Sequence, residues 1–233
     1  MLQKKLGSRP HKLGYLFFEL ANSMTELDII DISQQVDSST PAYFGDTPFS
    51  LSWLANLQIK TSEICVTPHV GTHADAPMHF SYSTEGIGDI PLNMFVGDCL
   101  VAPAELAVDV QSLKEWEVFK KYKECGKILF KFEDKTQGLG LDVAELLVND
   151  QFHLIGTNSE SIDNEDSEDF PIHHLLLGRG ICVLENLVLE RTDPGIYFLS
   201  AAPLKWRTAE ASPVRAFLLK KRRAAKFLSF QPL

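Results

Sequence analysis

The stretch His69-Val-Gly-Thr-His-Ala-Asp-Ala-Pro-Met-His-Phe80 constrains the fold and the chemistry of this chain more than any other part of the sequence. It contains three of the seven histidines and one aspartate within twelve residues. Imidazole nitrogens and a carboxylate, without a thiolate, suit zinc, manganese or iron(II). The stretch is therefore a candidate divalent-metal site, and metal-assisted hydrolysis is the first functional hypothesis.

We expect this stretch to form a strand end and a loop. Its first two histidines are four residues apart, which would place them on one face of a helix. Pro68, Gly71 and Pro77 interrupt the stretch, however, and make a helix unfavourable. The preceding residues, Ile64-Cys-Val-Thr67, are typical of a strand. A helical zinc-protease motif is therefore rejected.

An extended backbone would bring three ligands together, because side chains alternate along a strand and place His73 and Asp75 on one side. Gly71 allows a sharp turn that returns His69 to the same point. Three protein ligands leave a coordination position open for water, which is typical of catalytic sites. His79 follows closely and is a candidate acid or base. The alternative, a set of ordinary loop histidines, is weakened by this additional histidine.

A second group of candidate ligands lies downstream. Pro171-Ile-His-His-Leu-Leu-Leu-Gly178 predicts a short helix, with Pro at its start and Gly at its end, that carries His173 and His174. Gly180-Ile-Cys-Val-Leu-Glu-Asn-Leu-Val-Leu189 predicts a buried strand that contains one acid, Glu185. A buried carboxylate is costly unless it is paired or bound to a metal. Glu185 is therefore either a metal ligand or an ordinary strand residue. In the second case it is paired in a salt bridge or lies at the exposed end of the strand.

These residues resemble the bacterial kynurenine formamidases of the metal-dependent putative cyclase family. The signature His-x-Gly-Thr-His-x-Asp-x-Pro-x-His is complete in residues 69 to 79. Further family-like segments follow in family order between residue 28 and about residue 219: Asp31–Ser33, Gly45–Phe49, Ile87–Leu92, Gly97–Cys99, Ala202–Lys205 and Ala211–Arg215.

The resemblance implies a two-metal site. One ion would be held by His69, His73 and Asp75. The other would be held by Asp75, His173 and Glu185, because the twelve-residue step between the last two matches the family pattern and selects His173 over its neighbour. Zinc is the expected metal and manganese the alternative.

The resemblance also implies the reaction. A shared water with a lowered pKa would attack an amide carbonyl, and His79 would move the proton to the departing nitrogen. With N-formyl-L-kynurenine, an intermediate of tryptophan degradation, the products are L-kynurenine and formate. Two alternatives stay open: a sister hydrolase of the same fold that acts on another amide or lactam, as isatin hydrolases do, and a non-catalytic metal-binding protein. His79 argues against the last, because a purely structural site has no use for an uncommitted histidine.

Three departures from the family pattern bear on the substrate. Tyr43 and Phe44 stand where these enzymes commonly carry Trp-Pro, in a segment expected to wall the pocket. Asn158 replaces a carboxylate near the site, and Glu160 replaces a proline. We expect Tyr43, Phe44 and Asn158 to contact the substrate.

The fold is expected to be one mixed α/β domain. Strand-like runs at 127–132 and 152–155 alternate with an amphipathic stretch at 141–148, and no linker divides the chain. The resemblance implies a β-barrel-like core of mixed strands flanked by helices, of the swivelling β/β/α type. It also implies a homodimer.

The domain is expected to span residues 24–219, between an N-terminal extension at 1–23 and a basic C-terminal tail at 220–233. The formal charge of −9 argues against a general nucleic-acid binder. The apolar run Tyr15–Leu20 is too short to cross a membrane. Four widely spaced cysteines without a Cys-x-x-Cys pair suit a reducing cytoplasm. The expected partner is a small-molecule substrate.

Overall fold

The computed structural model describes residues 29–43, 45–54 and 59–220 of the 233-residue chain. Three expectations lie outside these residues: the extension at 1–23, the tail beyond residue 220, and the substrate contact of Phe44. No described helix has the length and apolarity that spanning a bilayer requires.

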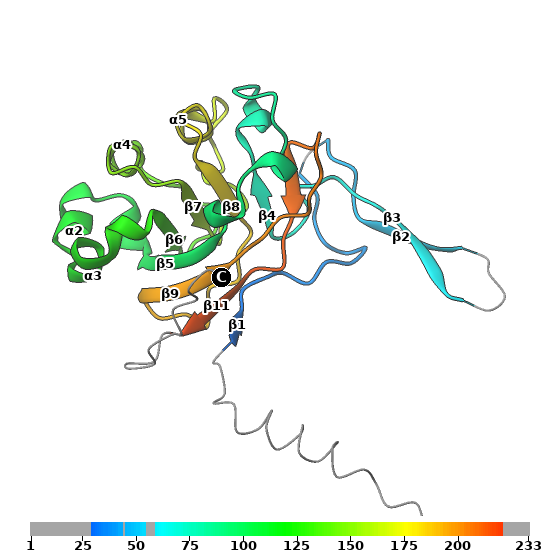
Figure 1. The fold of residues 1–233 in the computed structure, drawn as a ribbon, viewed down its shortest axis with the longest axis horizontal. Helices are drawn as coiled ribbons and strands as arrows, with labels where there is room; N and C mark the ends of the chain where they lie inside the picture. Colours follow the sequence, from blue (N-terminus) through cyan, green and yellow to red (C-terminus); the bar gives the residue numbers. More distant parts are fainter. Residues whose placement is uncertain (1–28, 44, 55–58, 221–233) are drawn as a thin grey trace, which may run out of the picture.

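A nine-stranded mixed sheet forms the centre of the molecule and curls into a half-barrel (Figure 1). Its strands lie in the order β1 (Ile29–Asp31), β11 (Phe217–Lys220), β9 (Gly195–Ser200), β5 (Val96–Pro103), β6 (Lys127–Lys131), β7 (Leu154–Thr157), β8 (Cys182–Glu185), β4 (His73–Asp75) and β10 (Ala211–Pro213). The run from β5 to β8 is parallel, and every other pairing is antiparallel. The expected mixed α/β domain with a barrel-like sheet and flanking helices is confirmed, although the sheet remains open.

Helices connect the parallel strands, as crossovers between parallel strands require. They are α2 (Val110–Glu115), α3 (Glu117–Tyr122), α4 (Leu141–Asn149) and α5 (Pro171–Leu177). All four lie on the outer side of the half-barrel (Figure 1). Short 3-10 helices occur in the loops, among them η1 (Pro77–Phe80) directly after β4.

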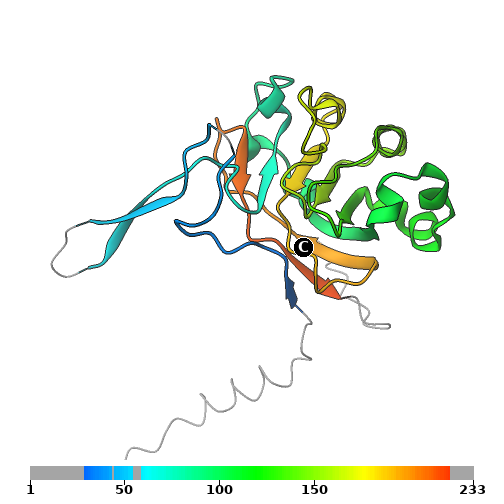
Figure 2. The ribbon, with the colours of Figure 1, turned by 180° about the vertical axis from the view of Figure 1, so that it is seen from behind.

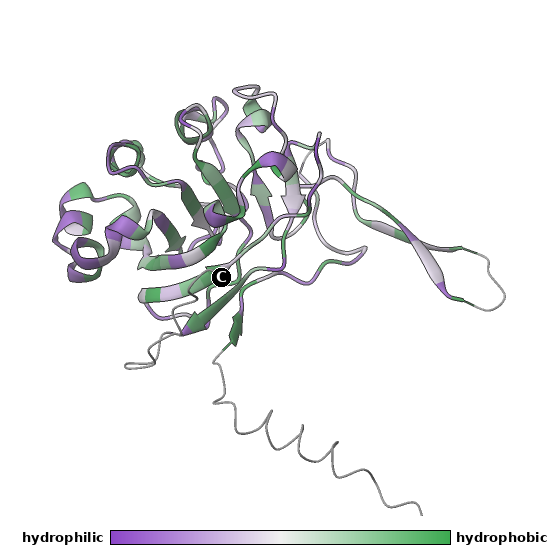
Figure 3. Cartoon of the chain, in the orientation of Figure 1, coloured by the Kyte–Doolittle hydropathy of each residue, from purple (hydrophilic) through white to green (hydrophobic). Residues whose placement is uncertain are grey.

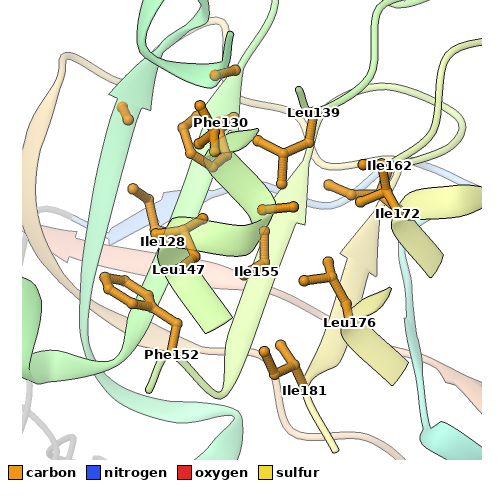
Figure 4. Close-up of a cluster of buried hydrophobic side chains, with 14 of the residues drawn as sticks. Ile128, Phe130, Leu139, Leu147, Phe152, Ile155, Ile162, Ile172, Leu176 and Ile181 are labelled. Atoms are coloured by element: carbon orange, nitrogen blue, oxygen red, sulfur yellow. The ribbon is translucent and has the colours of Figure 1, made fainter. Parts of the chain in front are cut away.

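Side-chain alternation along the strands divides the core into two layers. Ile128 and Phe130 of β6 point to the helices, where they pack with Leu147 of α4 and Leu176 of α5 (Figure 4). Leu129, between them in sequence, points to the opposite side and packs there with residues of β5, β8 and β9. The outer layer thus fixes α5 against the sheet, and α5 carries one of the expected metal ligands.

The elements agree with the sequence expectations except at three places. The strand expected at 64–67 spans Thr61–Cys65 instead. The expected helices and the strand at residue 127 are found within one residue of the expected ends. The long run expected at 180–189 is broken, because Asn186 adopts a left-handed conformation with φ 57° and ends β8 at Glu185. The strand expected at 152–155 begins at Leu154.

Strands β2 (Ser50–Leu54) and β3 (Thr61–Cys65) form a separate two-stranded ribbon that extends away from the body of the molecule (Figures 1 and 2). Both hydrophobic and hydrophilic residues occur along it (Figure 3). Leu51 lies opposite Ile64 in the register, and Trp53 is two residues further along the same face. All three side chains are exposed, Trp53 by 66%. The ribbon therefore presents an apolar face that the body of the domain does not cover.

Candidate metal centre and active site

Strand pairing places the first candidate ligands beside one another. In the antiparallel pair of β4 and β8, His73 lies directly opposite Glu185. The His73 Nε2 atom is 3.3 Å from Glu185 Oε2 and 3.5 Å from Asp75 Oδ1. His73 and Asp75 share one face of β4 because they are two residues apart, as expected from the sequence. All three side chains are buried.

The turn before β4 brings in His69. Gly71 has φ +69°, and a Cβ at this position would lie 2.5 Å from Val36 Cγ2, so only glycine fits. The turn places His69 Nδ1 3.2 Å from Asp75 Oδ1. It also places the Gly71 carbonyl oxygen 2.8 Å from His73 Nδ1, which donates a hydrogen bond to it. This bond commits Nδ1 of His73 and leaves Nε2 as the ring nitrogen that faces the carboxylates.

Helix α5 supplies the fifth residue, His173, and directs its neighbour elsewhere. His173 Nε2 is 3.2 Å from Glu185 Oε1 and 3.7 Å from Asp75 Oδ2. His174 instead pairs its Nδ1 with the hydroxyl of Tyr82 at 2.8 Å. The structure thus brings His173, and not His174, to the cluster.

Asp163, which the sequence analysis did not assign, orients His173. One of its carboxylate oxygens accepts a hydrogen bond from His173 Nδ1 at 2.7 Å. The same carboxylate accepts the backbone N–H groups of Ile172 (2.7 Å) and His173 (3.1 Å) in the first turn of α5. Asp163 therefore fixes both the ring orientation of His173 and the start of the helix that carries it.

The centre of the cluster contains buried polar atoms without hydrogen-bond partners. Among the described residues, four such side-chain atoms occur, and three belong to this cluster: His73 Nε2, Asp75 Oδ1 and Asp75 Oδ2. Buried polar groups are almost always paired, and a buried carboxylate without a donor is especially costly. A divalent cation would satisfy all three atoms at once. The residues therefore fit a metal centre, and Asp75 directs one oxygen to His69 and His73 and the other to His173.

The electrostatics of the cluster indicate the same requirement for positive charge. Burial lowers the pKa of His73, but the Asp75 and Glu185 carboxylates outweigh this effect and raise the pKa to about 9. Burial raises the pKa of Glu185, but His173 and His73 outweigh it and lower the pKa to about 2. The carboxylates thus hold protons on the histidines when no cation is bound. Metal binding would replace those protons.

His79 lies in η1, at the edge of the cluster. Its ring centroid is 4.4 Å from that of His69. Ring nitrogens of His69 and His79 and a carboxylate oxygen of Asp75 lie within 4.8 Å of one another. The pKa of His79 is lowered, chiefly by burial and further by the neighbouring histidines. A neutral imidazole in this position suits a proton acceptor, and the same distances also permit a metal contact.

A cavity of about 670 Å³ opens above the cluster. Its walls include the candidate ligands His69, His73, His173 and Glu185, together with His79, Phe80, Phe170, Glu160, Lys135, Glu210 and Tyr43. The volume is in the range of small-molecule sites. The position of Tyr43 fits its expected substrate contact.

The expected substrate contact of Asn158 does not fit the structure and is corrected here. Asn158 is buried and does not line the cavity. Its Oδ1 accepts the backbone N–H of Phe132 at 2.7 Å, and its Nδ2 donates to the Phe132 carbonyl at 2.8 Å. The amide oxygen and nitrogen of Asn158 therefore connect the segment after β6 to the segment after β7. Its neighbour Glu160 faces the cavity instead.

Glu210 also lines the cavity without having been singled out in the sequence. Its Oε1 atom is 3.4 Å from His69 Nε2. Glu210 directly precedes β10, which pairs with β4, so tertiary pairing alone brings it to His69. No sequence motif around Glu210 predicts this contact.

Comparisons with known proteins identify sequences similar to this chain. A family model described as putative cyclase matches residues 30–164. The kynurenine formamidase of Paracidovorax citrulli is 36% identical over 206 residues, covering 81% of this chain and 94% of that protein. The kynurenine formamidase of Bordetella avium is 35% identical over 202 residues, covering 81% and 96%.

Two solved structures share the fold. A potential metal-dependent hydrolase with cyclase activity superposes with a TM-score of 0.68 at 25% identity, over 83% of this chain and 99% of that one. Isatin hydrolase A from Labrenzia aggregata superposes with a TM-score of 0.66 at 20% identity, over 90% and 99%. At that identity the second likeness concerns the fold alone.

Proposed function

Since this chain belongs to the putative cyclase family, we propose that it is a metal-dependent amide hydrolase that converts N-formyl-L-kynurenine to L-kynurenine and formate in tryptophan degradation. The observation that carries the proposal is the buried cluster around Asp75, whose two carboxylate oxygens lack hydrogen-bond donors. Four of its neighbours in the cluster, His69, His73, His173 and Glu185, line the cavity. The relatives named kynurenine formamidase support the substrate.

In this proposal the chain holds two divalent ions. His69, His73 and Asp75 hold one, and Asp75, His173 and Glu185 hold the other. Zinc is the proposed metal and manganese the alternative, since both accept imidazole and carboxylate ligands. When bound, two such ions polarise a carbonyl oxygen and lower the pKa of a nearby water.

The remaining chemistry belongs to the side chains of the chain. His79 is neutral near pH 7 because its pKa is lowered, so it can accept the proton that the attacking water loses. It then donates that proton to the arylamine nitrogen as the formyl C–N bond breaks. Asp163 keeps His173 in the orientation that its contacts with Asp75 and Glu185 require.

The alternative substrate class is a cyclic amide, as in isatin hydrolases. The shared fold supports it, but these structures are at most 20% identical to the chain, whereas the kynurenine formamidases reach 36%. A non-catalytic metal-binding role is supported less, because His79 lies beside the cluster where a closed structural site needs no further histidine.

Formate release is the direct test. Purified protein loaded with zinc, or with manganese in a parallel sample, is expected to release formate from N-formylkynurenine and to leave isatin largely unhydrolysed. The variant His79→Ala is expected to keep its metal and lose turnover. Hydrolysis of isatin without formate release from N-formylkynurenine would establish the alternative, and inactivity on both would exclude both substrates.

A homodimer is part of the same proposal, and the β2–β3 ribbon supports it. Two-stranded ribbons are marginally stable on their own, yet this one carries the exposed apolar face of Leu51, Trp53 and Ile64 away from the body. A second copy offers the same face, so a two-fold pairing of ribbons would cover both. Asp46 and Thr67, which flank the ribbon, line the cavity. A partner on the ribbon would therefore lie close to the cavity entrance.

The oligomeric state can be measured on the intact chain by sedimentation. The protein is expected to sediment as a dimer, and Trp53→Lys to shift it to monomer without loss of secondary structure. Ser52→Lys, on the opposite face of the ribbon, is the matched control and should leave the dimer intact. A monomeric wild type, or a dimer insensitive to Trp53→Lys, would exclude this interface.

We place the protein in the cytoplasm, where its four cysteines, all free in the structure, would stay reduced.

A further inference from the structure

Phe170 has an unusual backbone conformation at the edge of the cavity. Its φ and ψ are 43° and 51°, in the left-handed region that bulky residues rarely adopt. It precedes Pro171, and a residue before proline is normally extended. It also occupies the N-cap position of α5, where Ser, Thr, Asp or Asn would supply a capping oxygen. Three local preferences therefore disfavour phenylalanine at this one position.

Hydrogen bonds around residue 170 fix its backbone, and its ring lies edge-to-face against the imidazole of His173, with the centroids 6.1 Å apart. Asp163 performs the capping that residue 170 does not, by accepting the N–H groups of Ile172 and His173. The Phe170 carbonyl accepts the His174 N–H at 3.0 Å in the first turn of the helix. The ring itself belongs to neither hydrophobic core of the described chain. Packing of the core therefore does not account for the aromatic side chain.

The ring of Phe170 faces the cavity next to Phe80. The two ring centroids are 6.0 Å apart at an angle of 69°, an edge-to-face arrangement. Phe80 in turn stacks on the imidazole of His173, with centroids 5.1 Å apart and planes within 13°. Both phenylalanines line the cavity, and Phe170 is only partly buried. They form a continuous aromatic surface that begins at a candidate metal ligand and ends at the cavity wall.

We propose that Phe170 is a specificity residue, and that it forms with Phe80 an aromatic wall that binds the aryl ring of the substrate. The inference rests on the proposed hydrolase site and states which class of amide that site prefers. Strained residues at binding sites are retained when the strained side chain contacts a ligand. An aryl ring packed against Phe170 would lie beside the cluster, with its amide substituent reaching Asp75 and Glu185.

A matched pair of metal-binding probes tests the wall without requiring turnover. Acetohydroxamate and benzohydroxamate share the group that binds metal and differ by one aryl ring. Their dissociation constants for the zinc-loaded, full-length protein are measured by calorimetry. In Phe170→Asn, which suits a left-handed N-cap, benzohydroxamate should bind about tenfold more weakly relative to acetohydroxamate. The thermal midpoint should stay unchanged or rise, because the backbone strain is relieved.

Two further variants complete the test. Phe170→Leu keeps an apolar side chain without the aromatic ring and should give an intermediate affinity ratio. Phe198→Leu alters a partly buried phenylalanine of β9 that does not line the cavity, and should leave the ratio unchanged. An unchanged ratio in Phe170→Asn, or a marked fall in the thermal midpoint of both Phe170 variants, would overturn the proposal and make the ring a packing residue. If the ratio falls but N-formylkynurenine releases no formate, the aromatic wall stands and the proposed substrate does not.

Discussion

The helix-covered layer of the sheet and the edge where β4, β8 and β10 meet bury opposite kinds of side chain. The helix-covered layer packs apolar residues such as Phe130, Leu147 and Ile155, all fully buried. The edge buries Asp75 and Glu185 among histidines and leaves polar atoms without hydrogen bonds. The first region stabilises the fold, whereas the second is costly to form and is explained by a bound cation. Variants in the two regions should therefore separate stability from chemistry.

The largest effect is expected at the bridging carboxylate. Asp75→Asn removes the charge that both proposed ions share and should lower formate release by about a thousandfold or more, with loss of bound metal. The far-ultraviolet circular dichroism should stay that of the wild type, because the helix-covered layer is untouched. Retention of both metal and activity would show that Asp75 is not a ligand.

A deletion in the helix-covered layer should produce the converse result. Leu147→Ala leaves a cavity under α4 and is expected to lower the free energy of unfolding by about 2–5 kcal/mol. Chemical denaturation measures this change. The activity of the remaining folded protein should equal that of the wild type, and a selective loss of kcat at full folding would contradict the separation of the two regions.

A smaller effect is expected where the two regions are joined. Asp163→Asn keeps the shape of the side chain, but it weakens the hydrogen bond that orients His173 and the bonds to the first turn of α5. Metal affinity should fall by about 10–100-fold, the range found for residues that orient a ligand. Competition with a fluorescent zinc chelator measures the affinity, and Asp166→Asn, in the same loop, serves as the control.

The smallest effect is expected at an exposed ion pair on the surface. Arg215 donates hydrogen bonds to Asp31, which lower the pKa of that carboxyl. A lowered carboxyl pKa adds stability above the ordinary range of about 4, and this stability is lost as the pH falls through the lowered value. Because the pair is exposed, Asp31→Asn should cost less than about 1 kcal/mol at pH 7. The difference in the free energy of unfolding between variant and wild type should shrink at pH 3. A difference that grows on acidification would contradict a stabilising ion pair between Asp31 and Arg215.

The parts of the site that lie close together in the sequence were predictable from it. His69, His73 and Asp75 stand within seven residues, so strand alternation and one glycine turn are enough to bring them together. His173 and Glu185 needed the spacing of a known family, because a helix-to-strand connection separates them. The strand at 127–132 and the helix at 141–148 followed from periodicity alone.

The remaining features depend on tertiary structure that no local pattern encodes. Glu210 reaches His69 only because β10 pairs with β4. Asn158 was expected at the substrate because it replaces a carboxylate. Its amide instead forms two hydrogen bonds with the backbone of Phe132, which follows the neighbouring strand β6. The left-handed conformation of Phe170 opposes the preference of its own residue type, so sequence reasoning could not anticipate it.

Elemental analysis of the purified protein shows whether Asp75 bridges two ions. We expect about two divalent ions per chain in the wild type and about one in Glu185→Ala, because Asp75 would bridge two ligand sets and Glu185 belongs to one of them. A wild type that holds one tightly bound ion, with a content unchanged in Glu185→Ala, would contradict the bridged two-metal centre.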